Sequence, residues 1–311
     1  MHRLVKSILG VYIFSFALTT INKTLFGKLR VPFPFFVTFI HFGLSSVVLK
    51  WVTFLKVKPQ VDLKVVVPIA ILTTLDIGLT NMVYSRVSLP VITVMKSANI
   101  VTTYLIGVAF GVEHFSVRLL SVCVLIVTSV AFAVPSAQIY DSLGILMLVI
   151  AIMSMSIRWV LIQKLVKDIE PIDLALATMP LSSLGFLFMS ICFEREILIN
   201  WITEKLEWFP VIIIFTSCVC AFSLLYFEFL TVKFASSLTL LLSGACKEIS
   251  ILIASAVMFD EFLSVINWIA IAVSLYGIVL YWKLRSAQPL YHQIHQPCEL
   301  TQAIPHAALG E

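Results

Sequence analysis

Residues 88–117 read SLPVITVMKSANIVTTYLIGVAFGVEHFSV, an apolar run that carries one lysine near its middle and ends in a charged turn. The run before the turn is about as long as a helix must be to cross the hydrocarbon core of a bilayer. On a helix, Lys96 shares one face with Thr93, Asn99 and Thr103. The stretch therefore predicts a membrane-spanning helix with a polar stripe centred on a lysine.

A second stretch, residues 236–265, reads SSLTLLLSGACKEISILIASAVMFDEFLSV and resembles the first. Lys247 takes the place of Lys96, with Thr239 and Ser243 on the same face, and a charged turn again leads through Phe to Ser-Val. An odd number of helices separates the two copies, so the second would be inserted upside down, as an inverted repeat. A chance match of two short turns is the alternative.

Apolar runs of similar length recur from end to end, joined by connections of a few residues. We therefore predict an all-helical polytopic membrane protein, with ten transmembrane helices as two inverted five-helix repeats. The repeats are 1–135 and 141–285, which together form a carrier domain over 1–285, and 286–311 is predicted to be a disordered cytosolic tail. The expected helices are 5–27, 33–55, 64–84, 88–110, 116–134, 143–163, 174–193, 209–231, 236–259 and 265–283.

The composition points to lipid as the solvent. Of 311 residues, 60% are hydrophobic and 12% are charged, and the mean hydropathy is +1.05. A water-soluble domain carries about twice that charged fraction. A soluble enzyme, a disordered linker and a nucleic-acid binder are thereby excluded, and the bilayer is a partner.

The positive residues give an orientation. With loops assigned alternately to two faces, twelve Lys and Arg residues fall on one face and five on the other. Because positive loops stay on the cytoplasmic side, both termini are expected in the cytosol and the number of spans is expected to be even.

Cysteines and histidines show no pattern of a disulfide frame, a metal site or an enzyme. Five of the six cysteines fall in apolar runs, and His41 is the one histidine within a span, where a packing role is expected. Glycine-rich phosphate loops, paired metal-ligand histidines and nucleophile elbows do not occur. We predict no enzymatic activity, no catalytic residue, no metal and no cofactor.

Ionisable residues inside the expected spans each cost roughly 2.5 to 3.5 kcal/mol if they face lipid, so each needs a partner or a use. For Asp76 and Glu228, an internal salt bridge and a functional role are equally balanced. For Lys96 and Lys247 we favour function, because they occupy corresponding points of the repeat.

Two lysines and Arg158 on one cavity would make a site for an anion with several oxygens. The alternative for Arg158 is a side chain that extends toward Lys164 and the cytosolic face. Asp76 and Glu248 would orient the lysines or bind a sugar or base. The candidate substrate-binding residues are Lys96, Lys247, Arg158, Asn22, Lys23, Asp76, Thr93, Asn99, Ser243 and Glu248.

These motifs carry a family resemblance over nearly the entire chain. Asn22-Lys23 ends the first helix, Thr93-x-x-Lys96-Ser97 lies in the fourth, and Gly244-x-x-Lys247-Glu248 lies in the ninth. The chain resembles the nucleotide-sugar and triose-phosphate translocator family of the drug/metabolite transporter superfamily. The motifs Ile157-Arg158-Trp159 and Pro171-Ile172-Asp173 are most similar to the branch of solute carrier family 35 related to GDP-fucose transporters.

The resemblance implies an antiporter of the Golgi or endoplasmic reticulum that exchanges a nucleotide sugar, GDP-fucose-like or other, for a nucleoside monophosphate by alternating access. Glu248 stands where plastid phosphate translocators carry arginine, which argues against a triose phosphate. The alternatives are a carrier of another organic phosphate and a non-transporting membrane regulator of glycosylation with the same fold. A homodimer is compatible with each reading.

Overall fold

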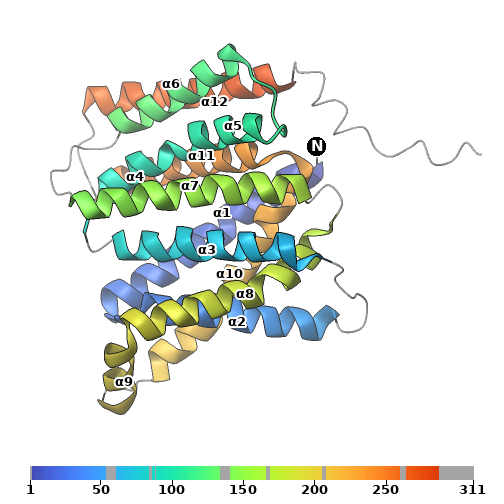
Figure 1. The fold of residues 1–311 in the computed structure, drawn as a ribbon. Helices are drawn as coiled ribbons and strands as arrows, with labels where there is room; N and C mark the ends of the chain where they lie inside the picture. The colour runs from blue at the N-terminus through green and yellow to red at the C-terminus, as the bar shows by residue number, and fades with distance from the viewer. Residues whose placement is uncertain are drawn as a thin grey trace, which may run out of the picture.

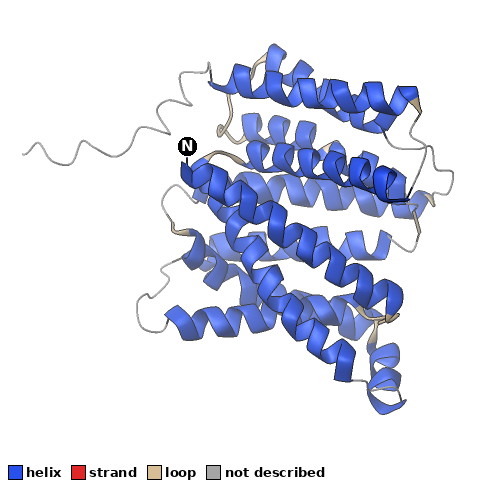
Figure 2. Cartoon of the chain, turned by 180° about the vertical axis from the view of Figure 1, so that it is seen from behind, coloured by secondary structure: helices blue, strands red, loops and turns tan. Residues whose placement is uncertain are grey.

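The computed structural model describes residues 2–53, 61–83, 86–87, 89–133, 141–165, 169–204, 208–259 and 264–286. Within these ranges every regular element is a helix (Figure 2), which confirms the all-helical prediction. The tail after residue 286, the turn at 260–263 and Cys298 lie outside the described residues. The helices are α1 (His2–Asn22), the π-helix η1 (Lys23–Lys28), α2 (Pro34–Thr53), α3 (Leu63–Val83), α4 (Leu89–Ser97), α5 (Asn99–Ala109), α6 (Val117–Ala133), α7 (Ser142–Leu165), α8 (Pro171–Phe193), α9 (Arg195–Glu204), α10 (Trp208–Phe234), α11 (Ser237–Phe259) and α12 (Val265–Ser286).

Each of the ten expected helices has a counterpart, with one difference in continuity. The helix expected over 88–110 is divided at Ala98 into α4 and α5, and the 194–208 connection contains the additional helix α9. The number of ten membrane spans stays a prediction. In the described part of the chain, seven segments are long and apolar enough to cross a membrane, and Val117–Phe132 is a shorter apolar helix: the seven are Arg3–Phe26, Pro34–Trp51, Leu63–Val83, Ser142–Leu165, Pro171–Phe193, Trp208–Phe234 and Val265–Arg285.

The long helices lie side by side as a bundle and pack in four extensive pairs (Figure 1). The pair α6 and α12 lies at one side of the bundle, and the pair α2 and α8 lies at the opposite side. Between them, α3 packs on α7, and α1 packs on α10. The first residues of α1 and the last residues of α12 lie at the same end of the bundle, as an even number of crossings requires.

Apolar side chains fill the centre of the bundle and also cover much of its outer surface. Trp159 and Tyr104 are almost completely buried, whereas Phe16 and Phe188 are more than 60% exposed. Apolar side chains on both sides of a helix are typical of membrane spans. None of the five described cysteines forms a disulfide.

Helix α12 packs tightly against α6 at Gly277. A Cβ atom built there would lie 2.7 Å from the Cγ1 atom of Ile126, which is fully buried. We expect Gly277→Ala to destabilise the protein by about 1 to 3 kcal/mol through overpacking. Thermal unfolding in detergent measures this. Gly244→Ala is the matched control, because no described atom lies within 4 Å of its Cβ position; an equal loss in both variants would contradict the explanation.

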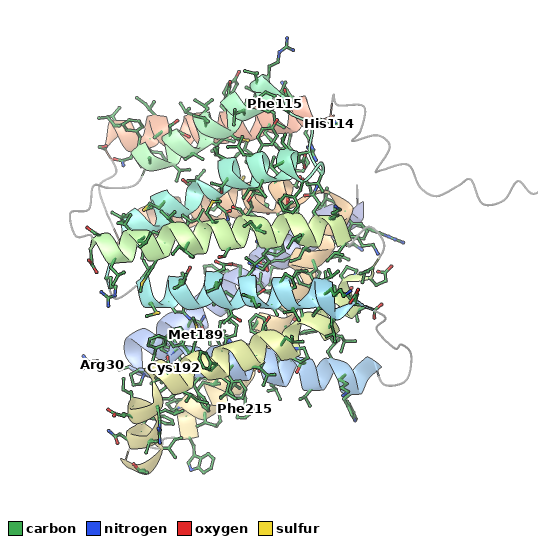
Figure 3. The ribbon with its side chains drawn as sticks, viewed as in Figure 1. Arg30, His114, Phe115, Met189, Cys192 and Phe215 are labelled. Atoms are coloured by element: carbon green, nitrogen blue, oxygen red, sulfur yellow. The ribbon has the colours of Figure 1, made fainter. Side chains whose placement is uncertain are left out.

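Glu194, between α8 and α9, holds the first turn of α2. Its two carboxylate oxygens accept the backbone N–H groups of Phe35 at 2.7 Å and Phe36 at 2.9 Å. A carboxylate is favourable at a helix N-terminus. Burial raises the pKa of Glu194, and the hydrogen bonds to it act in the opposite direction. This contact joins α2 to the corner where α8 ends, near Met189 and Cys192 in Figure 3.

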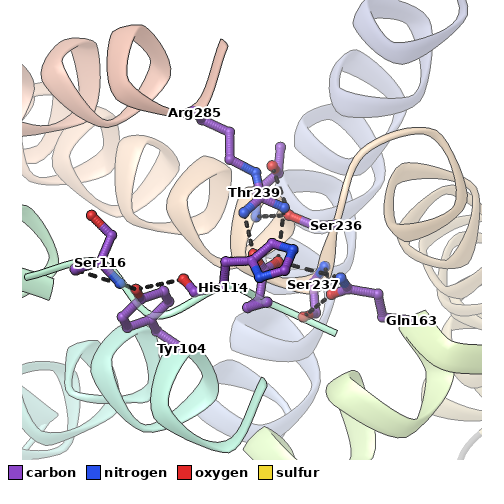
Figure 4. A network of polar contacts seen from close by, with 9 residues as sticks. Tyr104, His114, Ser116, Gln163, Ser236, Ser237, Thr239 and Arg285 are labelled. Atoms are coloured by element: carbon purple, nitrogen blue, oxygen red, sulfur yellow. Dashed lines mark hydrogen bonds and ion pairs between the residues drawn. The ribbon is translucent and has the colours of Figure 1, made fainter. Parts of the chain in front are cut away.

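A network of polar contacts lies at the end of the bundle where α12 terminates (Figure 4). Glu113, just after α5, accepts two hydrogen bonds from the guanidinium of Arg285 on α12. Gln163 of α7 donates to Glu113 over 3.3 Å and accepts from the backbone N–H of Ser237 over 2.8 Å. The network therefore ties together α7, α11, α12 and the connection between α5 and α6.

Candidate functional site

The division between α4 and α5 places two candidate residues at a helix break. Lys96 lies in the last turn of α4, and Asn99 begins α5. The backbone N–H of Ala98 bonds to the carbonyl of Met95 over 3.1 Å, a tighter turn than α-helix. The break therefore lies between Lys96 and Asn99.

Lys96 and Lys247 line the same cavity, which has a volume of about 210 Å³. The ammonium group of Lys247 on α11 donates a 2.7 Å hydrogen bond to the hydroxyl of Ser15 on α1. Among the described side chains, no carboxylate oxygen lies within 4.0 Å of either ammonium group. Two cations from helices that lie far apart in the sequence thus face one polar space.

Arg158 supplies a third cation to this cavity. Its Nη2 donates to Oδ2 of Asp76 over 2.8 Å, and its guanidinium carbon lies 4.4 Å from the ring centre of Trp159. Arg158 is buried, so the alternative in which it extends toward the cytosolic face does not hold. Asp76, which lines neither cavity, takes the salt-bridge role that the sequence left open and fixes α3 to α7.

Asn99 lines the cavity with its side chain held from α7. With the amide oriented as in the structure, its Oδ1 accepts from Ser156 at 2.5 Å and from Thr103 at 3.0 Å. Its Nδ2 lies 2.8 Å from the sulfur of Met155. Because three partners fix the amide, Asn99 forms a rigid part of the wall.

The remaining predicted site residues lie in different surroundings. Ser243 lines neither cavity; its hydroxyl donates to the carbonyl of Leu240, and its own carbonyl accepts from Tyr12 over 2.8 Å. It therefore joins α11 to α1. The backbones of Thr93, Glu248 and Lys23 belong to α4, α11 and η1, and their side chains lie outside the described part of the structure.

A second cavity of about 300 Å³ lies next to the first, and Asn22 lines it. Arg158 and Glu228 line both cavities, so the two spaces meet at these side chains. His41 also lines the second cavity, and its Nε2 lies 2.6 Å from the hydroxyl of Ser217. The packing role expected for His41 is thus accompanied by contact with this cavity.

Two wall residues could be recognised in the sequence only in part. Glu228, for which the sequence left a salt bridge and a functional role open, lies in the C-terminal part of α10 and lines both cavities. Ser15 belongs to a serine and threonine stripe on the first helix that the pattern of hydroxyls already indicates. Its pairing with Lys247 depends on how α1 and α11 are rotated, which periodicity within one helix does not specify.

Comparisons with known proteins identify the family of this chain. Residues 3–282 match the model of the Triose-phosphate Transporter family. A probable sugar phosphate/phosphate translocator from Arabidopsis thaliana is 29% identical, over 88% of this chain and 82% of that protein. A second one is 24% identical over 82% and 79%, and the GDP-mannose transporter GONST5 from the same plant is 22% identical over 92% and 86%. The family match covers nearly the whole chain, both lysines included: the chain is a membrane protein that belongs to the triose-phosphate transporter family, within the drug/metabolite transporter superfamily.

Proposed function

We propose that the chain is a secondary-active carrier that exchanges organic phosphates across a membrane by alternating access. The outgoing and incoming substrates are a nucleotide sugar, GDP-fucose-like or other, and a nucleoside monophosphate; a sugar phosphate exchanged for phosphate is the second candidate. The names of the relatives support both, because they include sugar phosphate/phosphate translocators and a GDP-mannose transporter. The observation that carries the proposal is that Lys96, Lys247 and Arg158 line one cavity.

The chemistry of these three side chains suits a phosphate group. Lysine binds phosphate as a point charge, and arginine presents several N–H donors in a planar fork. Arg158 uses Nη2 for Asp76, and its buried Nε has no hydrogen-bond partner among the described residues. A phosphate oxygen would satisfy that donor.

The charge balance of the site favours exchange over one-way transport. Three cations line the first cavity, whereas the described carboxylates at or behind its wall are Glu228 and Asp76. An excess positive charge is costly inside a membrane protein until an anion neutralises it. Reorientation of the empty carrier is then slow, and a bound anionic substrate accelerates it because it neutralises the positive charge that would otherwise be buried during the transition.

The order of helix packing supports two inverted repeats. We take the first as α1, α2, α3, α4 with α5, and α6, and the second as α7, α8, α10, α11 and α12. A two-fold axis would pair corresponding helices, such as α2 with α8 and α6 with α12, and would exchange the α3–α7 pair with the α1–α10 pair. These are the four extensive pairs. In such a carrier the substrate site lies near the bilayer midplane. We further propose that the protein resides in the Golgi or endoplasmic reticulum with both termini in the cytosol.

A ligand panel tests the proposed function. The purified full-length protein is heated in detergent with inorganic phosphate, hexose phosphates, nucleoside monophosphates and nucleotide sugars. A carrier of organic phosphates is stabilised by those it binds, by about 2.7 kcal/mol at a hundred times the dissociation constant. Exchange of the same compounds in proteoliposomes should follow the order of stabilisation. If no member of the panel raises the melting temperature, the carrier proposal fails, and the non-transporting reading is favoured.

A further inference from the structure

The second cavity differs from the first in its chemistry. Apart from Arg158 and Glu228 on the wall shared with the first cavity, its polar lining comes from the uncharged side chains of Asn22, Thr38, Thr73 and Asn81, together with His41. Among its lining residues, Arg158 is the one Lys or Arg, and this residue belongs to the wall shared with the first cavity. A phosphate group bound in the second cavity would therefore have no cation other than Arg158 to pair with. The cavity is suited to an uncharged group that carries hydrogen-bond donors and acceptors.

Aromatic and aliphatic side chains complete the wall. Phe26 and Phe42 line the cavity together with leucine, valine and isoleucine side chains of α1, α2, α3 and α10. A mainly apolar wall with a few fixed polar groups is typical of sites that bind the ring of a small molecule. Its volume of about 300 Å³ lies at the lower end of the range for ligand pockets.

Asn22 carries an unsatisfied polar atom at this cavity. Its Oδ1 is buried, and no donor among the described residues bonds to it. The side chain also forms no capping hydrogen bond to the π-helix η1 that follows it. A buried acceptor without a donor is unfavourable, and a ligand hydroxyl or N–H group would remove the penalty. Irregular π-helical turns of this kind are frequent at functional sites.

The two cavities are placed to hold two parts of one molecule. Arg158 lies at their junction, fixed by Asp76 and Trp159, with Glu228 on the same shared wall. A phosphate among Lys96 and Lys247 would therefore leave the rest of its molecule next to the second cavity.

We propose that the second cavity binds the uncharged ring of an organic phosphate, a sugar or a nucleoside, through Asn22 and its polar neighbours, while the phosphate lies between the lysines. The inference rests on the proposed function and adds to it the element that selects organic phosphates over inorganic phosphate. The shared chemistry is a ring with hydroxyl or N–H donors, which sugars and nucleosides both supply.

The test compares ligand classes in matched variants. Affinities of inorganic phosphate, a hexose phosphate, a nucleoside monophosphate and a nucleotide sugar are measured on the purified full-length protein, wild type and Asn22→Leu. We expect Asn22→Leu to weaken at least one organic phosphate about tenfold, the equivalent of one hydrogen bond, and to change the affinity for inorganic phosphate less than twofold. The class that loses most identifies the ring. Asn81→Leu is a second variant at the same cavity, and Asn200→Leu on the exposed face of α9 is the control.

The outcomes separate this inference from the carrier proposal. If wild-type protein binds no phosphate compound, the proposed function fails. If wild-type protein binds organic phosphates and both cavity variants bind them as Asn200→Leu does, the second cavity has no part in recognition. The inference is also overturned if both variants weaken inorganic phosphate as much as the organic phosphates, because the substitutions then act on the fold or on the phosphate site.

Discussion

Lys247→Ala should reduce exchange in proteoliposomes to the background of empty vesicles. The substitution removes one of the cations of the first cavity and the donor to Ser15, while the cavity itself becomes larger. Removal of one partner from a buried charge pair costs about 2 to 5 kcal/mol or more in binding. The affinity for a phosphate should therefore fall by about thirtyfold or more. Lys96→Ala should have an effect of the same kind from the opposite repeat.

The control for this prediction is a lysine of the same chain outside the cavity. Lys233, near the end of α10, is partly exposed and lies 2.6 Å from Glu170. Exposed ion pairs contribute roughly 0 to 1 kcal/mol, so Lys233→Ala should retain both folding and exchange. Lys247→Arg should recover part of the activity, because it keeps the charge but changes its geometry. Normal exchange by Lys247→Ala would refute the assignment of this lysine to the substrate.

The sequence predicts the helices and singles out two lysines that line one cavity in the structure, for a physical reason. Length and hydropathy alone indicate where a chain enters and leaves a bilayer, and Lys96 and Lys247 are conspicuous because charges are rare in apolar runs. Their common cavity follows if the two stretches are related by an inverted repeat. Length, hydropathy and isolated charges are properties of a single segment, so each helix can be recognised without knowledge of its neighbours.

Contacts between segments could not be predicted in the same way. Asp76 and Arg158 are 82 residues apart, and the sequence around each residue does not indicate that the two side chains form an ion pair. The helix break at Ala98 cannot be recognised from the residue types, because Ser97 and Ala98 are neither proline nor glycine. The second cavity depends on the mutual rotation of α1, α2, α3 and α10, which periodicity leaves undetermined. These parts of the site therefore arise only when the helices pack together.

The largest loss of stability is expected from Glu113→Ala. Glu113 and Arg285 are both buried, and their ion pair is bidentate. Breaking such a pair from one side costs about 3 to 5 kcal/mol, because the charge of Arg285 then stays buried without its carboxylate partner. The substitution also removes the acceptor of the Gln163 side chain, which links α7 to α11. The melting temperature in detergent should fall well below that of the wild type.

An exposed ion pair and a double variant show whether the loss arises from the buried charge. Arg86 and Asp141 form a 2.9 Å pair whose side chains are 41% and 45% exposed, so Asp141→Ala should cost less than about 1 kcal/mol. Replacement of both buried partners, Glu113→Leu with Arg285→Met, should recover much of the stability lost in Glu113→Ala, since neither charge is then left unpaired. A double variant as unstable as the single one would mean that the Gln163 hydrogen bonds, rather than charge compensation, stabilise the helix packing at this end of the bundle.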